Sequence, residues 1–193
     1  HSVDAKLIYF ANPDNPMGTH VPGDKIVEAL KELPLGCLFI LDEAYSEFAP
    51  AASLPNLEIT DKRVVRLRTF SKAYGMAGAR VGYAMAEENL IKSFEKVRNH
   101  FGMNRLAQKA AFEALSDNQW LLEMVKKVEN GRQRIYKIAA SNNLKSITSS
   151  TNFVAIDCGK DGNFARKVLT ELISLGIFVR MPFVSPQDRC IRI

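Results

Sequence analysis

The sequence predicts an α/β fold, in which a mostly parallel sheet with flanking helices is followed by a smaller α+β domain. Apolar runs at 7–11 and 36–41 enclose a segment with helical spacing at 24–33, and this strand–helix–strand order is typical of a parallel sheet covered on both faces. Beyond residue 150 the chain returns to short strands around one helix. With 193 residues, 47% of them hydrophobic, it can form one large or two small cores.

The first half carries four apolar runs that we expect to be strands, at residues 7–11, 36–41, 64–67 and 81–85. The Asn-Pro-rich loop 12–18 closes the first of them. The helix at 24–33 has apolar residues at positions 26, 27, 30 and 33, and Pro34 ends it.

Helices dominate the middle of the chain, and we expect them at 87–101, 104–115 and 117–140. Ser116 or Asp117 can cap the last of these. The remainder predicts a strand at 152–157, a helix at 163–175 ended by Gly176, and short strands at 177–180 and 189–193. We therefore expect a first domain at 1–116 and a smaller domain at 117–193 that is incomplete at its end.

Composition limits the classes of function. The net charge of +5 comes from scattered basic residues, and without a basic stripe or an aromatic platform we expect no nucleic-acid partner. No apolar run approaches a membrane span, and residues 1–6 lack the features of a secretory signal. The three cysteines show no paired spacing, which favours a reduced, cytoplasmic protein. His20 and His100 show no metal-ligand spacing, so no metal site is expected.

Three short motifs carry the chemistry. Lys72 lies in Thr-Phe-Ser-Lys-Ala-Tyr-Gly-Met-Ala-Gly-Ala-Arg, with hydroxyls before it and glycines after it. Asp42 and Tyr45 belong to Asp-Glu-Ala-Tyr at the end of the second apolar run, and Asn15 lies in Asn-Pro-Asp-Asn-Pro-Met-Gly. An amine, an acid, a phenol, an amide and a cluster of anion ligands are the groups needed to hold and use pyridoxal phosphate.

Each group has a chemical reason to take part. The Lys72 amine can form a Schiff base with a carbonyl cofactor and afterwards act as general base and acid. Asp42 can pair with a protonated pyridine nitrogen, which keeps the ring able to accept electrons. Tyr45 and Asn15 can hydrogen-bond the phenolic oxygen of the ring. Asn15 and Asp42 both follow expected strands, where open α/β sheets bind ligands.

Anionic groups also have candidate partners. Thr69, Ser71 and Arg80 can supply two hydroxyls and a guanidinium fork to the cofactor phosphate. Arg180 and Arg192, on neighbouring expected strands of the smaller domain, can bind a substrate carboxylate.

Taken singly, these residues have ordinary explanations. Asp42 can be a helix cap or a metal ligand, Lys72 a surface lysine, and Arg80 a salt-bridge partner. Asn15 can be a turn residue and Tyr45 an amphipathic residue at the edge of a core. Only their joint spacing favours a cofactor site.

The three motifs resemble those of the fold-type I, class I/II aminotransferases that use pyridoxal phosphate. Within that group, Ser71–Tyr74, the helix start at 104–108 and the ending at 176–193 resemble histidinol-phosphate aminotransferases most. The resemblance implies a partial large domain, a transfer of an amino group between histidinol phosphate and a 2-oxo acid through a Lys72 Schiff base, and a homodimer. In that family the arginines that match Arg180 and Arg192 contact the substrate carboxylate.

The resemblance also implies that residues are missing. The family's N-terminal part supplies a ring that stacks on the cofactor and further phosphate ligands, and none of these can be placed here, so the chain resembles an internal segment of a longer enzyme. We expect such a piece alone to be poorly active or inactive. Alternatives are a decarboxylase of the threonine-phosphate type, a non-catalytic aminotransferase-like effector domain and an inactive truncated product.

Overall fold

The computed structural model describes residues 5–193; residues 1–4, part of the N-terminal segment considered above, lie outside the described residues. The chain divides into two compact units, which are described separately. Unit 1 contains the chain up to Pro13 and Val21–Val125, and unit 2 contains Asp14–His20 and Lys126–Ile193.

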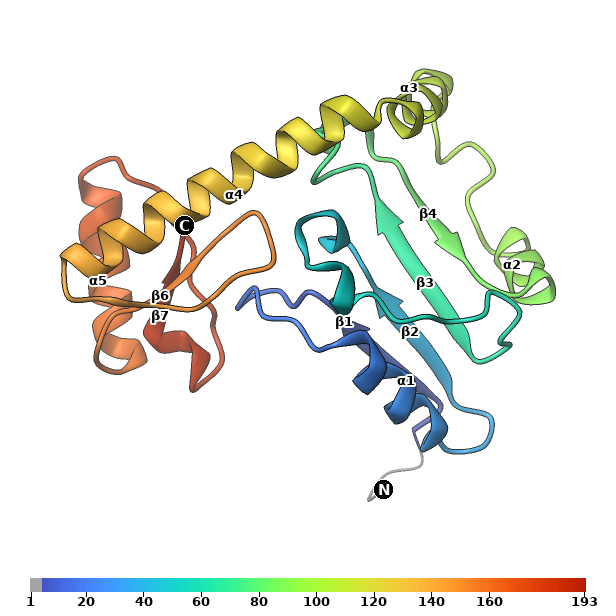
Figure 1. The fold of residues 1–193 in the computed structure, drawn as a ribbon, viewed down its shortest axis with the longest axis horizontal. Coiled ribbons are helices and arrows are strands. Elements are labelled where there is room, and N and C mark those ends of the chain that lie inside the picture. Colours follow the sequence, from blue (N-terminus) through green and yellow to red (C-terminus); the bar gives the residue numbers. More distant parts are fainter. Residues whose placement is uncertain (1–4) are drawn as a thin grey trace. The chain divides into compact units, whose positions relative to one another are not determined.

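A four-stranded sheet forms the centre of unit 1 (Figure 1). Its strands, in spatial order, are β1 (Leu7–Ala11), β2 (Leu38–Asp42), β3 (Val64–Thr69) and β4 (Gly82–Met85). The first three run parallel and β4 is antiparallel to β3, so the expected mostly parallel sheet with flanking helices is confirmed. The register pairs Ala11 with Asp42 and Asp42 with Leu67, which brings the carboxyl ends of the three parallel strands to one edge.

Helix α1 (Gly23–Lys31) covers one face of this sheet. Ile26 and Leu30 share a helix face and pack into a buried cluster with Phe39, Leu41 and Val64. Because side chains alternate along a strand, burying Leu41 under α1 turns the next residue of β2, Asp42, to the opposite face. The sheet therefore presents Asp42 on the face that α1 leaves open.

Two further helices follow β4 in unit 1: α2 (Glu88–Glu95) and α3 (Arg105–Ser116). Ala107 and Ala111 of α3 pack with Phe70 and Val81. The expected helix at 87–101 is wrong in its second half, since α2 ends at Glu95. Val97 is 83% exposed, and a helix whose apolar residues find nothing to pack against loses most of its stabilisation.

Unit 2 contains a three-stranded antiparallel sheet in the order β5 (Lys145–Ser146), β6 (Ala155–Asp157) and β7 (Cys190–Arg192). Helix α5 (Gly162–Ser174) and the long helix α4 (Asn118–Ser141) complete its elements. Ala139, Val154, Ile156 and Ile191 form its buried core. The expected strand at 177–180 is reduced to a single bridge between Arg180 and Arg192.

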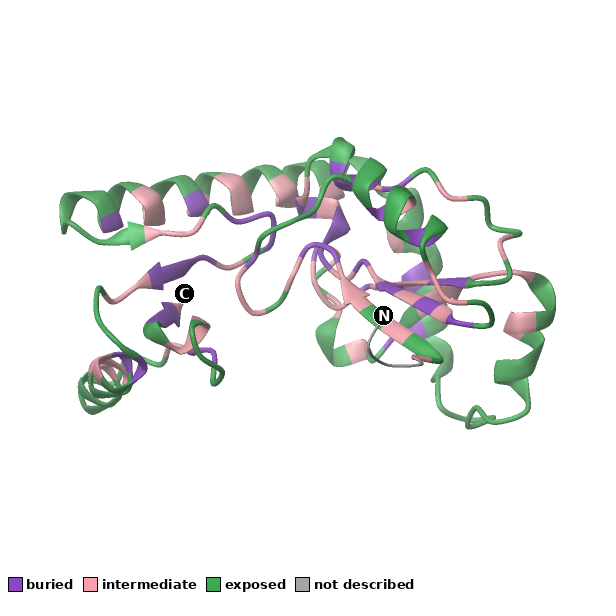
Figure 2. Ribbon diagram, turned by 90° about the horizontal axis from the view of Figure 1, so that it is seen from below, coloured by how far each residue is buried: buried purple, intermediate pink, exposed green. Residues whose placement is uncertain are grey.

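Helix α4 begins in unit 1 and ends in unit 2, with the division between Val125 and Lys126. The expected boundary after residue 116 therefore differs from the observed one, because the first turns of α4 belong to unit 1. The helix is largely exposed along its length, with Arg132 and Ala139 as its buried positions (Figure 2). Leu122, for example, is 69% exposed, since this side of the helix has no covering element among the described residues.

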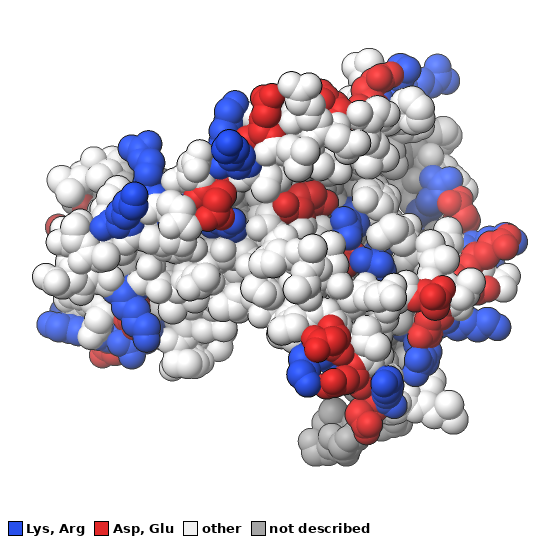
Figure 3. Space-filling model, in the orientation of Figure 1, with Lys and Arg blue, Asp and Glu red and all other residues white. Residues whose placement is uncertain are grey.

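Acidic and basic side chains are intermixed over the face shown in Figure 3, in keeping with the scattered charges of the sequence. Across residues 5–193, no helix combines the length and the apolar character needed to cross a membrane.

Candidate functional site

The lysine segment follows β3 and folds back on itself. The amide of Met76 donates to the Phe70 carbonyl (2.9 Å), and the amide of Gly75 donates to the Lys72 carbonyl (2.9 Å). The amide of Phe70 in turn donates to the Val81 carbonyl (3.2 Å), and the Phe70 side chain is buried. Lys72 thus lies on a short turn that is fixed at both ends of its backbone.

Lys72 and Tyr45 come together in unit 1. The Lys72 Nζ lies 5.3 Å from the centroid of the Tyr45 ring. Tyr45 is buried, and Lys72 is partly buried. Tyr45 follows Asp42 by three residues, so the turn after β2 brings a phenol to the amine that follows β3. The structure therefore brings two of the predicted cofactor-binding residues into contact distance.

Asp42 is the last residue of β2, and its carboxylate is held by two donors. The amide of Ala44 donates to Oδ1 (2.9 Å), and the Tyr9 hydroxyl donates to Oδ2. Burial, together with this hydrogen bond, raises the pKa of Tyr9 to about 12. Tyr9 therefore stays protonated at neutral pH and acts as a donor to Asp42.

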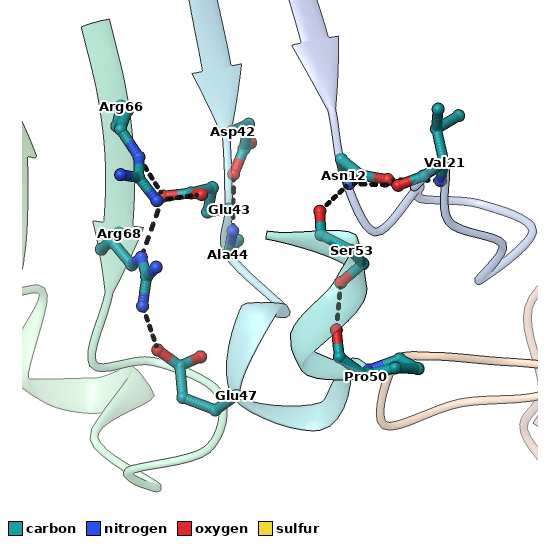
Figure 4. Close-up of polar contacts among 10 residues, drawn as sticks. All are labelled: Asn12, Val21, Asp42, Glu43, Ala44, Glu47, Pro50, Ser53, Arg66 and Arg68. Carbon is teal, nitrogen blue, oxygen red and sulfur yellow. Dashed lines mark hydrogen bonds and ion pairs between the residues drawn. The ribbon is translucent and has the colours of Figure 1, made fainter. Parts of the chain in front are cut away.

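The neighbouring acid has a different environment. Glu43 is 1% exposed and accepts two hydrogen bonds from Arg66 (3.0 and 2.7 Å) and one from Arg68 (3.0 Å), as Figure 4 shows. Arg68 also lies 3.5 Å from Glu47, whose pKa is raised by burial. Glu43 is thus an internal counter-ion that joins the loop after β2 to β3.

The three predicted phosphate ligands lie near the junction of β3 and β4. Thr69 pairs with Gly82 across the two strands, which places it near the turn that carries Arg80. The Thr69 hydroxyl accepts a hydrogen bond from the amide of Ser71 (3.1 Å). Arg80 is exposed, has a left-handed backbone (φ +56°) and donates to the Ala77 carbonyl (2.7 Å). Two hydroxyls and a guanidinium are thus available within two adjoining turns.

The remaining predicted site residues belong to unit 2. Arg180 and Arg192 exchange backbone hydrogen bonds of 3.1 and 2.7 Å, so the two arginines are direct neighbours. Arg192 Nη1 donates to Asn15 Oδ1 (2.5 Å), and its guanidinium carbon lies 4.6 Å from the centroid of the Phe153 ring. Arg192 is thus held between an amide and an aromatic face.

These residues open onto a cavity of about 520 Å³ in unit 2, whose lining includes Asn15, Arg180 and Arg192 together with apolar side chains such as Phe178 and Phe183. Two cations, an amide and an apolar wall form an environment suited to a small organic anion.

The predicted residues therefore form two groups. Unit 1 carries Lys72, Asp42, Tyr45 and the three phosphate candidates, and unit 2 carries Asn15 with the two arginines. Sequence reasoning missed Tyr9 and Phe153. The expected strand at 7–11 contained a signal for Tyr9, because its side chain points to the same face as that of Ala11, the residue that pairs with Asp42.

Comparison with known proteins gives the context for this geometry. The model of the family "Aminotransferase class I and II" matches residues 1–193. The chain belongs to this family. A histidinol-phosphate aminotransferase of Carboxydothermus hydrogenoformans is 40% identical over 192 residues, which cover 97% of this chain and 52% of that protein. The chain therefore spans about half the length of the curated relatives it matches.

Solved aminotransferase structures agree with the fold. The histidinol-phosphate aminotransferase of Sinorhizobium meliloti, solved in complex with pyridoxal-5'-phosphate, matches with a TM-score of 0.95 and 51% identity over 98% of this chain and 53% of that one. The L-threonine-O-3-phosphate decarboxylase of Porphyromonas gingivalis shares the fold, with a TM-score of 0.76 and 24% identity. The fold expected for a partial class I/II aminotransferase is thereby confirmed.

Proposed function

We propose that this chain carries the lysine half and the carboxylate-binding half of an aminotransferase that uses pyridoxal phosphate, with histidinol phosphate as amino donor and a 2-oxo acid as acceptor. The observation that carries the proposal is the approach of the Lys72 amine to the buried Tyr45 ring, beside the strand end that presents Asp42, in a chain that matches the family throughout.

The donor set of unit 1 fits this cofactor. An amine, a phenol and a carboxylate lie on turns that follow the carboxyl ends of β2 and β3. The Ala44 amide and the Tyr9 hydroxyl donate to Asp42 and orient its carboxylate, which would face a protonated ring nitrogen. Thr69, Ser71 and Arg80 supply the donors that a phosphate needs.

Pyridoxal phosphate, when bound, supplies an aldehyde for covalent attachment and a ring that accepts electrons. The chain's own residues do the rest. The Lys72 amine would hold the aldehyde carbon, and as a free amine it would be able to move a proton at the substrate Cα. The Asp42 carboxylate would pair with the ring nitrogen, and the Tyr45 hydroxyl and the Asn15 amide would donate to the phenolic oxygen.

Arg192 and Arg180 bind the anionic end of the substrate. A guanidinium fork holds a carboxylate through two parallel hydrogen bonds, which fixes the direction of the bond to Cα. The contacts of Arg192 with Asn15 and Phe153 restrict the orientation of that fork before the substrate arrives, so less conformational entropy is lost on binding.

The attachment site can be tested directly. The protein is mixed with pyridoxal phosphate, reduced with borohydride and mapped by peptide mass spectrometry. We expect the label on Lys72, its loss in Lys72→Ala, and its retention in a control that removes an exposed lysine, Lys96→Ala. Labelling spread over many lysines, unchanged in Lys72→Ala, would refute the assignment of Lys72.

The reaction needs a separate test. Histidinol phosphate added to the cofactor-loaded protein should convert the bound cofactor to pyridoxamine phosphate, and 2-oxoglutarate should restore it. Release of carbon dioxide from phosphothreonine without pyridoxamine phosphate would favour the decarboxylase instead. Cofactor binding without turnover of either substrate would favour the effector domain or an inactive piece.

Three wider proposals accompany this function. Unit 1 corresponds to part of the large cofactor-binding domain, and unit 2 to the small domain. The active form is a homodimer, as the family resemblance implies. The protein works in the cytoplasm, a proposal supported by three cysteines that are all free thiols.

A further inference from the structure

Loop 14–20 is part of unit 2, although the residues before and after it belong to unit 1. The loop is a closed turn: the amide of Asp14 donates to the Thr19 carbonyl (2.8 Å), and the amide of Gly18 donates to the Asp14 carbonyl (3.0 Å). Its backbone therefore holds its own shape, and Asn15 lies on it.

The loop is seated on three buried hydroxyl residues of unit 2, Ser149, Ser150 and Thr151, which we call the hydroxyl cradle. The amide of Ser150 donates to the Gly18 carbonyl (2.7 Å), and the Ser150 hydroxyl lies 2.8 Å from His20 Nδ1. A Cβ added at Gly18 would lie 2.5 Å from Ser149 Oγ and 3.1 Å from Ser149 Cβ, so the loop or the serine would have to shift. Gly18 also has φ +80°, in the left-handed region that favours glycine.

The cradle is itself held from within unit 2. The Ser149 amide donates to the Tyr136 hydroxyl oxygen (2.8 Å), and Arg132 Nη1 donates to the Thr151 carbonyl (3.0 Å). Both partners are on α4, and Arg132 is nine-tenths buried. The loop thus rests on a surface whose backbone polar groups have fixed partners.

The segments that flank the loop are fixed in unit 1. The Asn12 side chain accepts from the Val21 amide (2.8 Å) and donates to the carbonyls of Val21 (3.0 Å) and Ser53 (2.9 Å), as drawn in Figure 4. Asn12 thus joins the residues that precede and follow loop 14–20. The loop itself is positioned by its contacts with the hydroxyl cradle.

We infer that Gly18, seated in the hydroxyl cradle, is a positioning residue that sets the Asn15 amide oxygen against Arg192 and so preassembles the carboxylate-binding half-site on unit 2. This inference rests on the proposed function for the identity of the ligand. It assigns Asn15 a role towards Arg192 that is additional to its predicted contact with the cofactor. The charge-assisted bond between the two side chains restricts the guanidinium, and the loop keeps the amide in place.

The chain offers a closely matched pair of variants. Gly18→Ala adds a Cβ at φ +80° against the cradle, whereas Gly159→Ala adds one at φ +81° with nothing within 4 Å. Both glycines are in unit 2 and both variants carry the same backbone strain, so the difference between them isolates the seating of the loop. Ser150→Ala removes only the hydroxyl that contacts His20 and serves if Gly18→Ala does not fold.

Two measurements on the 193-residue chain test the inference. Amide hydrogen exchange followed by mass spectrometry should show faster exchange in loop 14–20 for Gly18→Ala, and no such change there for Gly159→Ala. Calorimetric titration with succinate, a dicarboxylate that cannot be transaminated, should show a dissociation constant raised about tenfold by Gly18→Ala and by Asn15→Ala, as expected for the loss of one charge-assisted hydrogen bond.

The outcomes distinguish failure of the positioning role from failure of the proposed aminotransferase function. Equal effects of the two glycine variants on exchange and on succinate would overturn the positioning role. Faster exchange with unchanged succinate binding would overturn it too, since the loop would then move without consequence for Arg192. Failure of Lys72 labelling, with succinate binding still sensitive to Gly18→Ala, would reject the proposed reaction and leave the half-site as inferred.

Discussion

Replacing the buried acid of unit 1, Glu43→Gln, should destabilise the protein without touching any residue assigned to the cofactor. The carboxylate is 1% exposed, and the side chains of its partners Arg66 and Arg68 are 20% and 18% exposed. The substitution preserves the shape of the side chain but removes its charge, so two guanidinium groups lose their shared counter-ion.

The magnitude follows from the surroundings. Removing one partner from a buried ion pair costs about 3–5 kcal/mol of unfolding free energy. Arg68 retains Glu47 at 3.5 Å, and both arginines reach solvent in part, so we expect the lower end, about 3 kcal/mol. With a urea dependence of about 2 kcal/mol per molar, the unfolding midpoint should fall by roughly 1.5 M.

The assay is urea unfolding monitored by circular dichroism. Its control is Glu95→Gln, which breaks a 2.7 Å pair with Arg98 whose side chains are 56% and 50% exposed. Exposed pairs of this kind contribute about 0.2–1 kcal/mol, so this midpoint should barely move. If Glu43→Gln and Glu95→Gln shift the midpoint equally, the network shown in Figure 4 does not carry the stability assigned to it.

Three further predictions concern unit 1. Burial raises the pKa of Glu47 in the folded protein above its ordinary 4.5. The protonated side chain therefore contributes fully to the unfolding free energy below pH 4.5, and this contribution is lost as the pH rises through the pKa of the folded protein. Urea unfolding between pH 4.5 and 7 should show this loss, and Glu47→Gln should abolish it. Subtracting the spectrophotometric titration of Tyr9→Phe from that of the parent should give a phenol with pKa about 12, and a difference midpoint near 10 would mean that Asp42 does not hold Tyr9. Gly82→Ala places a Cβ 2.7 Å from a backbone carbonyl oxygen of β3 and should lower the unfolding free energy by about 1–3 kcal/mol. Gly78→Ala, where the Cβ meets nothing within 4 Å, should have a smaller effect on thermal unfolding. Similar losses of stability in both variants would contradict the close approach at Gly82.

The strands of unit 1 could be predicted because the amino-acid pattern that favours a strand lies within each segment. The runs at 7–11 and 64–67 are mostly apolar, and the first appears as β1 at those positions while the second begins β3, which continues to Thr69. The strand end at Asp42 was equally predictable, since two acids, Asp42 and Glu43, follow an apolar run. Residues that follow parallel strands meet at one edge, and this rule predicts that Asp42 lies where ligands bind. The 5.3 Å approach of Lys72 to Tyr45 comes from the structure alone.

Elements whose stability depends on distant partners could not be predicted in the same way. Helical spacing continues past Glu95 to Val97, yet α2 ends because the second half of the pattern has nothing to pack on among the described residues. The run at 177–180 begins with three apolar residues, as a buried strand can, but within the described residues it forms a single bridge, between Arg180 and Arg192. The spacing of apolar residues indicates which element a segment can form, whereas the surface available for packing determines how long that element is.

The placement of Asn15 shows the same limit at the site itself. Its position after an expected strand predicts a place where ligands bind, but it does not predict the partners of its loop, which is bonded to Ser150 of the hydroxyl cradle within unit 2. The absence of a side chain at Gly18 leaves room for the side chains of Ser149 and Thr151, beside the bond from the Ser150 amide to the Gly18 carbonyl (2.7 Å). A glycine in the sequence indicates a turn, but it does not show which surface the turn will approach. Since one Cβ is enough to block that approach, the matched substitutions at Gly18 and Gly159 examine the step that sequence reasoning could not reach.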